Sequence, residues 1–345
     1  MKFISIVRTA GKILPGMVLA VAVAALAQFL EKLMPVHLIG ASVIALFIGM
    51  LLNVFLDKTE IFRPGLKFTS KKILKFAIIL LGASLSLGTI LHVGRLSLVV
   101  MLFTLLTCFG GGYLVGKALG LNWRLSSLIS AGTGICGGSA IAAVAPVIDA
   151  EDRDIAYAMS ATFLFDMVMI LLFPVMGHLM DLSDLAYGLW TGTAVNDTSS
   201  VVAAGYAYTE AAGDFATMVK LTRTLAIIPT VLVFSVIGIR VKRRELAGHP
   251  ASGKEVSLLK IFPWFILGFL ALAMVNSFGV IPAAVSAGAK DLSKFLMVAA
   301  LGAIGMGTSF RELKKAGAAP MFHGFIISAL VVIVAILVEY FMGIV

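Results

Sequence analysis

The chain has 345 residues, of which 60% are hydrophobic and only 13% charged, and its mean hydropathy is +1.05. Soluble domains carry roughly 25% charged residues, so this composition excludes a water-soluble domain and predicts an integral membrane protein. In a membrane protein, the net charge of +9 indicates which loops are cytoplasmic. We therefore expect no nucleic-acid partner. The two cysteines, Cys108 and Cys136, lie in apolar segments without metal-ligand spacing, so no metal site and no cofactor are predicted.

Apolar segments of about 20 residues predict membrane-spanning helices rather than the strands of a barrel. We expect an all-α fold with about eleven spans. In chain order they are residues 14–34, 37–56, 73–91, 96–118, 126–148, 155–180, 185–206, 215–239, 259–279, 295–310 and 321–344.

The charges of the connecting loops predict the topology. Basic residues gather in the loops 57–72, 120–125, 240–254 and 311–315, whereas the loop 149–154 and the pair Glu210 and Asp214 are acidic. Because cytoplasmic loops are enriched in Lys and Arg, we expect a multi-pass protein of the bacterial inner membrane with a cytoplasmic N-terminus. An odd number of spans then places the C-terminus outside. The acidic loop 181–184 falls on the basic side and is the exception.

The number of spans also predicts an internal repeat within a single transporter domain. After an extra helix in residues 1–36, residues 37–180 and 181–345 each hold five spans. An odd-numbered unit repeated in tandem has opposite orientations, which is the arrangement of inverted-repeat transporters. The fifth and tenth spans would be counterparts, and both are rich in glycine: GTGICGG begins at Gly132, and GAIGMG occupies residues 302–307. We expect both to be interrupted near the middle of the membrane, with Gly305 at the second interruption.

The stretch GTGICGGSAIAAVAPV begins at Gly132 and breaks an apolar segment. Lipid cannot satisfy the backbone groups that a broken helix exposes, so such a break lines a polar cavity or is buried in protein. A half-helix that begins near residues 137–139 would direct its N–H groups toward an anion. The alternative is close helix packing by small residues. The candidate binding residues here are Thr133, Gly134, Cys136, Gly137, Gly138 and Ser139.

Two further motifs carry polar residues inside apolar segments. In GTAVNDTSSV (192–201), Asn196, Asp197 and Thr198 are candidates for the same cavity; the alternative is that Asp197 caps a helix at the membrane interface. In KLTR, Lys220 and Arg223 share one helix face. They would attract an anion, pair with Asp197 or Asp166, or extend to the lipid headgroups.

Asp166 lies near the middle of the sixth span. An ionisable residue within the membrane is a functional-site hypothesis by default. Asp166 and Asp197 are therefore the candidate ion-coupling residues, with H+ or Na+ as the coupled ion.

Four motifs in this order resemble a bacterial family of sulfate exporters: GTGICGGSAIAAVAPVI, LWTGTAVNDTSSVVAAG, KLTRTLAIIP and PWFILGFL. The family is grouped with cation–proton antiporters and anion transporters. The resemblance covers about residues 40–317 and implies two inverted five-helix repeats, two broken helices that cross at the membrane midplane, and a homodimer. Two positions depart from the family pattern: Asn196 stands where the family commonly has histidine, and Asp166 where an uncharged residue is expected.

These observations predict a secondary transporter of a small anion, sulfate or a related sulfur oxyanion or sulfonate, that works by alternating access. A sodium/proton antiporter is the first alternative. An intramembrane aspartyl hydrolase that uses Asp166 and Asp197 is the alternative from another class, but the Gly-x-Gly-Asp pattern of such enzymes is absent before Asp197. We therefore expect no enzymatic activity.

Overall fold

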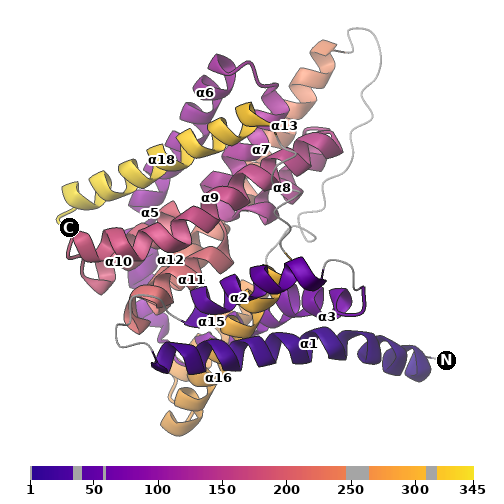
Figure 1. Cartoon of the computed structure of the whole chain (residues 1–345). Helices are drawn as coiled ribbons and strands as arrows, with labels where there is room; N and C mark the ends of the chain where they lie inside the picture. The colour runs from indigo at the N-terminus through magenta and orange to yellow at the C-terminus, as the bar shows by residue number, and fades with distance from the viewer. Residues whose placement is uncertain (1, 34–40, 57–59, 246–263, 308–316) are drawn as a thin grey trace. The chain divides into compact units, whose positions relative to one another are not determined.

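The computed structural model describes residues 2–33, 41–56, 60–245, 264–307 and 317–345. Every regular element in these ranges is helical, which confirms the predicted all-α membrane fold (Figure 1). Five helical segments are long and apolar enough to cross a bilayer by length and composition: Gly11–Leu33, Leu87–Ala118, Arg153–Leu179, Glu210–Val241 and Ala318–Phe341. The predicted loops 240–254 and 311–315 lie partly or wholly outside the described residues, as do the starts of the second and ninth predicted spans.

The chain divides into two compact units. The first comprises Met1–His92, Val202–Gly213 and Trp264–Phe310, and the second comprises Val93–Val201, Asp214–Pro263 and Arg311–Val345. Each unit takes segments from both predicted repeats, 37–180 and 181–345. The division into two inverted five-helix repeats stays a prediction.

The first unit is built on the contact between α2 (Ala41–Leu56) and α16 (Ala283–Met306), and α1 (Lys2–Leu33) packs on both. The other side of α16 contacts α4 (Leu74–Gly82), which in turn packs on α15 (Trp264–Ser277). The loop predicted at 57–72 is helical from Arg63 onward, because α3 (Arg63–Phe68) continues through a π-helical turn at Thr69–Ile73 into α4. Glycine allows α3 to approach α1 closely: a Cβ at Gly65 would overlap the carbonyl oxygen of Ile13.

The helix α16 is continuous at Gly305, so no interruption lies at that residue; it ends at the C-cap Gly307, and residues 308–316 lie outside the described part of the chain. The helix α16 continues through Met306. A Cβ atom at Gly305 would overlap the carbonyl oxygen of Leu46, and one at Gly49 would overlap the carbonyl oxygen of Gly302. Here glycine serves the close approach of two helix backbones, which is the packing use of small residues in membranes.

We expect Gly305→Ala to lower the free energy of unfolding by about 1–3 kcal/mol, since the added methyl group must push α2 and α16 apart. Gly288→Ala on the same helix is the matched control, because its Cβ would meet no atom within 4 Å. Alanine should stabilise α16 there by up to about 1 kcal/mol. Thermal unfolding of the purified variants measures both effects, and equal stability of Gly305→Ala and the parent would contradict the packing role.

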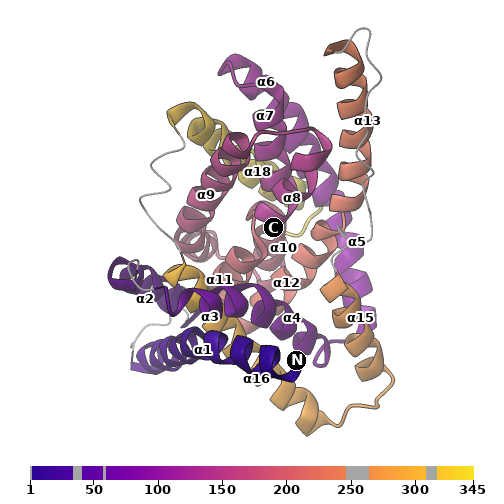
Figure 2. The same ribbon diagram turned by 90° about the vertical axis from the view of Figure 1, so that its right-hand side faces the viewer.

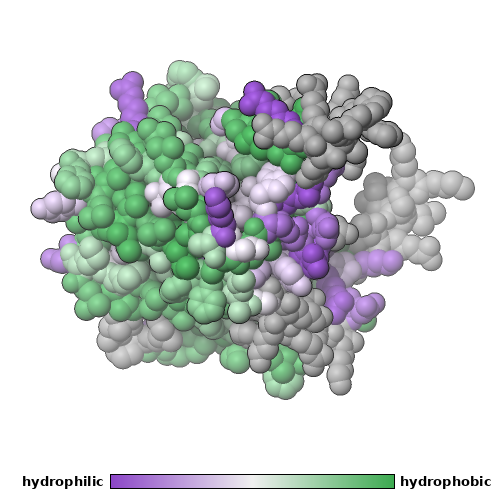
Figure 3. Space-filling model, turned by 90° about the horizontal axis from the view of Figure 1, so that it is seen from above, coloured by the Kyte–Doolittle hydropathy of each residue, from purple (hydrophilic) through white to green (hydrophobic). Residues whose placement is uncertain are grey.

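The second unit contains α9 (Asp152–Leu179) and α18 (Ala318–Phe341), which pack on each other. Gly324 lets them approach, since a Cβ there would lie 3.1 Å from that of Ala161. The helix α10 (Asp184–Ala194) packs on α18, and Trp190 Nε1 donates a hydrogen bond to the carbonyl oxygen of Val332 (2.9 Å). Much of the surface seen in Figure 3 is hydrophobic, as the membrane environment requires.

Residues 123–148 form a helical hairpin. The helix α7 (Trp123–Ala131) continues through a π-helical turn at Gly132–Cys136, and the chain reverses at Gly137 into α8 (Gly138–Val144), which contacts α7. The two ends of the hairpin lie together: Arg124 Nε donates to the carbonyl oxygen of Ile148 (3.0 Å).

A hydrogen bond from Asn122 Nδ2 to the carboxylate of Asp154 (3.2 Å) joins the flanking residues of this hairpin. A segment that crossed the membrane would separate its ends by about 30 Å. The predicted crossing of residues 126–148 is therefore wrong, although the predicted break near Gly137 is confirmed. Loops 120–125 and 149–154, expected on opposite sides, lie on the same side.

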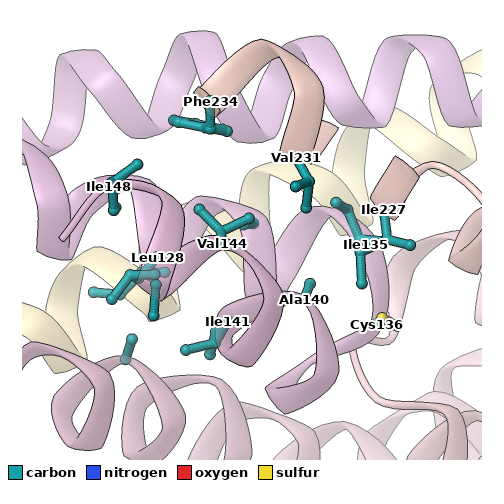
Figure 4. Close-up of a cluster of buried hydrophobic side chains, with 14 of the residues drawn as sticks. Leu128, Ile135, Cys136, Ala140, Ile141, Val144, Ile148, Ile227, Val231 and Phe234 are labelled. Carbon is teal, nitrogen blue, oxygen red and sulfur yellow. The ribbon is translucent and has the colours of Figure 1, made fainter. Parts of the chain in front are cut away.

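The hairpin is about half as long as the hydrocarbon core of a bilayer is thick, as its packing on α13 (Ile227–Glu245) indicates. At its base, a Cβ at Gly238 would lie 2.7 Å from the carbonyl oxygen of Val147. Near its tip, Ile227 lies beside Ile135 (Figure 4). The eleven residue-to-residue steps from Ile227 to Gly238 span roughly 16 Å at 1.5 Å per step, against a hydrocarbon core of about 30 Å.

A second hairpin includes α10 and α11 (Thr198–Tyr208). The helices α10 and α12 (Glu210–Thr224) run parallel: a Cβ at Gly192 would lie 2.6 Å from Val219 Cβ, and three residues further on Val195 accepts a hydrogen bond from Lys220. The predicted span 185–206 is interrupted at Val195–Asp197, and its crossing of the membrane stays a prediction.

The first hairpin changes the predicted topology. Because residues 120–125 and 149–154 share one side, α9 carries the chain to the other side, where the acidic loop 181–184 lies. The loop 181–184 then no longer falls on the basic side, but the acidic loop 149–154 now shares a side with the basic loop 120–125. One of the eleven predicted spans, residues 126–148, turns back instead of crossing.

Candidate functional site

The tip of the first hairpin is a backbone turn that only glycine adopts readily. Gly137 has φ +64° and ψ −132°, and it separates the π-helical turn from α8. A Cβ atom at Gly137 would lie 3.1 Å from both Cβ and Oδ1 of Asp197, which belongs to the second hairpin. The tips of the two hairpins therefore meet within the second unit. As predicted, a half-helix begins at Gly138, although it is only seven residues long.

The tip of the second hairpin is the break Val195–Asp197, which contains neither glycine nor proline. Asp197 caps α11: its Oδ2 accepts hydrogen bonds from the backbone N–H (2.9 Å) and the hydroxyl group of Ser199. Such a cap satisfies N–H groups that have no partner within the helix. The capping role considered for Asp197 is confirmed, and the cap lies against the tip of the first hairpin at Gly137.

Asp166 on α9 holds the same helix end. Its Oδ1 accepts the backbone N–H of Asn196 (3.0 Å), and its Oδ2 accepts that of Asp197 (3.1 Å). Only 1% of Asp166 is exposed. A carboxylate at this position satisfies two donors at once and opposes the positive end of the helix dipole.

Lys220 and Arg223 of α12 bind the carboxyl-terminal ends of the two helical segments that precede the breaks, the π-helical turn Gly132–Cys136 and α10. Lys220 Nζ donates to the carbonyl oxygens of Ile135 (2.8 Å) and Val195 (2.9 Å). Arg223 donates from Nε to Gly134 (2.6 Å), from Nη1 to Val195 (3.2 Å) and from Nη2 to Thr133. These carbonyls end the π-helical turn of the first hairpin and α10, so the two cations lie at the negative ends of two interrupted helices.

The burial of both cations corrects one reading of KLTR. Lys220 is 0% and Arg223 1% exposed, so neither extends to the lipid headgroups. Among the described residues, no ion pair within 4.0 Å joins either cation to Asp166 or Asp197. The two cations bind carbonyl groups at the carboxyl-terminal ends of helical segments, and the two carboxylates bind N–H groups at the amino-terminal end of α11. The formal charges of the four side chains therefore cancel at the hairpin tips.

Some polar atoms at the tips have no hydrogen-bond partner within the described part of the chain. They are both side-chain atoms of Asn196 and the hydroxyl group of Thr133, each fully buried. Thr191, one turn before Val195, has the same property and was not among the predicted residues. Its spacing of four residues from the break could have suggested it. Buried polar groups without partners cost free energy, so these atoms mark a place for a small polar ligand or water.

The other predicted residues divide into three sets. Gly134 and Cys136 are buried in the first tip, where they contribute backbone to it. Gly138, Ser139 and Thr198 lie with Asp197 on the part of the tips that is at least partly exposed. Gly305 belongs to the first unit and packs against α2.

The fold and the site define a class: a multi-pass α-helical membrane protein in which two helical hairpins meet at a buried centre of compensated charge. Comparison with known proteins then identifies the family. The model of the conserved hypothetical protein 698 family matches residues 15–342, so the chain belongs to that family.

The chain also matches relatives along nearly their whole length. It is 55% identical over 334 residues to a UPF0324 membrane protein of Clostridium tetani, covering 95% of this chain and 97% of the relative. It is 40% identical over 339 residues to UPF0324 membrane proteins of Streptococcus pyogenes and Streptococcus mutans, covering 96% of this chain and 98% of each relative. These matches confirm a conserved family of membrane proteins.

Proposed function

We propose that this protein is a secondary transporter of a small anion, sulfate or a related sulfur oxyanion or sulfonate, and that it works by alternating access. The observation that carries the proposal is the pair of buried cations at the meeting hairpin tips. Interrupted helices within the membrane are a common way to build transport sites, because their ends offer unpaired backbone groups to ions. The resemblance to sulfate exporters supports the choice of substrate, and the inverted repeat belongs to the same proposal.

The donors at the tips suit an oxyanion. Lys220 uses two of the three N–H donors of its ammonium group, and Arg223 uses three of the five of its guanidinium group. The unpartnered side-chain amide of Asn196 belongs to the residue that follows Val195, whose carbonyl oxygen accepts from both cations. The unpartnered hydroxyl group belongs to Thr133, whose own carbonyl oxygen accepts from Arg223. An oxyanion that accepted from these groups would stabilise an otherwise costly buried arrangement.

A ligand-binding screen with Asn196→Leu tests the proposal. The anion that binds should raise the melting temperature of the parent. At a concentration one hundred times its Kd, it should add about 2.7 kcal/mol to the apparent free energy of unfolding. The screen includes sulfate, sulfite, thiosulfate, taurine, dicarboxylates and sodium. Because the Asn196 side chain has no partner, leucine should leave the ligand-free protein as stable as before, and yet reduce the anion-induced shift.

Ser328→Ala is the matched control, since the hydroxyl group of Ser328 is also buried without a partner but lies on α18. This variant should keep the full anion-induced shift. If no anion raises the melting temperature, or if Asn196→Leu responds as the parent does, the anion site is not at the hairpin tips. Flux of the binding anion in proteoliposomes then tests transport itself.

Sodium/proton antiport is the second candidate, and the position of Asp197 favours it. Its carboxylate is partly exposed at the tip, next to Asp166, which bridges the preceding backbone. If Asp166 carries the coupled proton, Asp166→Asn should remove the pH dependence of flux. Flux that depends on pH and sodium but on no anion would favour antiport over anion transport.

The remaining expectations belong to the same proposal: a protein of the bacterial inner membrane with a cytoplasmic N-terminus and an external C-terminus, coupled to H+ or Na+, homodimeric and not an enzyme. The aspartyl hydrolase is the least favoured alternative. Both oxygens of Asp166 accept backbone N–H groups, and Oδ2 of Asp197 caps a helix. Such carboxylates are engaged in structure rather than directed at a shared water molecule.

A further inference from the structure

A groove of about 890 Å³ lies in the second unit between α5 and α13. One wall is α5 (Leu87–Leu106) with its continuation into α6 (Gly112–Ala118), and the other is α13, which lies beside α5 in Figure 2. The rings of Phe109 and Phe234 meet across it at 5.6 Å between centroids. The groove lies against the packing between α13 and the first hairpin.

The rim of the groove faces the surroundings of the protein with apolar side chains. Leu102, Leu106 and Val233 line it and are each more than half exposed. Its walls belong to the segments Leu87–Ala118 and Glu210–Val241, both long and apolar enough to cross the bilayer. The groove therefore opens to the hydrocarbon of the membrane, and a chain of methylene groups fits its lining.

One end of the groove is polar and positively charged. Trp123 lines this end, and its Nε1 donor is buried without a partner among the described residues. The guanidinium group of Arg124 lies 5.4 Å from the Trp123 ring. Lys117 is exposed one turn after the lining residue Tyr113, and Arg240 is exposed next to the lining residue Val241.

The acidic loop 149–154 begins next to Ile148, whose carbonyl oxygen accepts from Arg124. Its Asp154 is buried and accepts from Asn122, and its Glu151 lies 3.5 Å from Arg153. Basic and aromatic residues at one end of an apolar groove are typical of sites for anionic lipid headgroups. The indole N–H of Trp123 is positioned where the ester or phosphate oxygens of a lipid would follow its acyl chain.

We propose that this groove binds one anionic phospholipid, with an acyl chain between α5 and α13 and the headgroup at Trp123, Lys117 and Arg240. The floor of the groove includes Ala226, three residues after Arg223. A bound lipid would thus contact the turn between the buried cation and α13. The occupant is a membrane lipid, distinct from the transported anion at the hairpin tips.

Filling the groove tests the proposal. Gly110 lines it, and a Cβ there would meet no atom within 4 Å, so Gly110→Leu adds side-chain volume to the groove without a backbone clash. In native mass spectrometry after incubation with phosphatidylglycerol, the parent should retain one lipid per chain. Gly110→Leu should retain at least about tenfold less, which corresponds to the exclusion of roughly two methylene groups.

Gly288→Leu on α16 is the matched control, because its Cβ also has no neighbour within 4 Å and it does not line the groove. It should bind as the parent does. If Gly110→Leu does not fold, Val233→Trp at the exposed rim fills the groove instead. Equal retention by parent and groove-filled variants would overturn the site.

The headgroup specificity has its own readout. The parent should prefer phosphatidylglycerol to phosphatidylethanolamine, and the double variant Lys117→Gln, Arg240→Gln should lose this preference. Trp123→Phe keeps the ring but removes the N–H donor, and should weaken retention about two- to tenfold. A parent that binds both lipids equally, or a double variant with unchanged preference, would overturn the assignment of an anionic lipid.

Discussion

Replacing Arg223 with alanine should both destabilise the protein and stop transport. The variant leaves the buried carbonyl oxygens of Thr133 and Gly134 without their charged donor, and that of Val195 with Lys220 alone. Buried polar groups that lose a partner cost roughly 1–3 kcal/mol each, so we expect a loss of about 3–5 kcal/mol of unfolding free energy. Unfolding in detergent and anion flux in proteoliposomes measure the two effects.

Arg240→Ala is the control for this experiment, since Arg240 is exposed on α13 and should change stability by no more than about 0.5 kcal/mol. Arg223→Lys keeps the charge but cannot reach several carbonyls with a planar fork, so it should recover part of the stability. If Arg223→Ala unfolds at the parent's temperature, the hydrogen bonds to the first hairpin do not hold its tip.

Gly137→Ala should have the second large effect. The φ of +64° with ψ −132° is a conformation that residues with a Cβ rarely adopt, and strain of this kind costs of order 1–3 kcal/mol. The added Cβ would also lie 3.1 Å from Asp197. We therefore expect a lower melting temperature and impaired transport, because the change separates the two hairpin tips.

The adjacent residue provides a matched control for Gly137→Ala. A Cβ at Gly138 would approach nothing closer than Met159 Cε at 3.9 Å, so Gly138→Ala should fold and unfold nearly as the parent does. A normal melting temperature for Gly137→Ala would show that the chain can turn there without glycine. Reduced stability of both variants alike would mean that the whole turn, rather than its special backbone conformation, is sensitive.

The polar residues of the site could be found from the sequence because the membrane makes them conspicuous. Asp166, Asn196, Asp197, Lys220 and Arg223 interrupt apolar segments, and the second unit brings them all to the hairpin tips. Their partners could not be found in this way. The cations were expected to face an anion or a carboxylate, whereas they hold backbone carbonyls of segments up to 90 residues away.

The glycine-rich motifs illustrate the same limit. GTGICGG and GAIGMG look alike in composition, yet Gly137 turns the chain whereas Gly305 brings α2 and α16 together within a continuous helix. Neighbouring residues do not distinguish a glycine needed for its φ from one needed for its missing side chain. The second break at the site, Val195–Asp197, contains no glycine at all.

Composition alone determined that this is a helical membrane protein, because a chain with 13% charged residues cannot cover a water-facing surface. The positions of polar residues within apolar segments also showed which side chains are too polar to face lipid. The tertiary structure decided that the apolar segment 126–148 turns back on itself and that the segment 185–206 is interrupted at Val195–Asp197. Hydropathy measures how much of a segment can be buried, but not its direction, and that direction depends on contacts such as those of Arg124 with Ile148 and Lys220 with Val195.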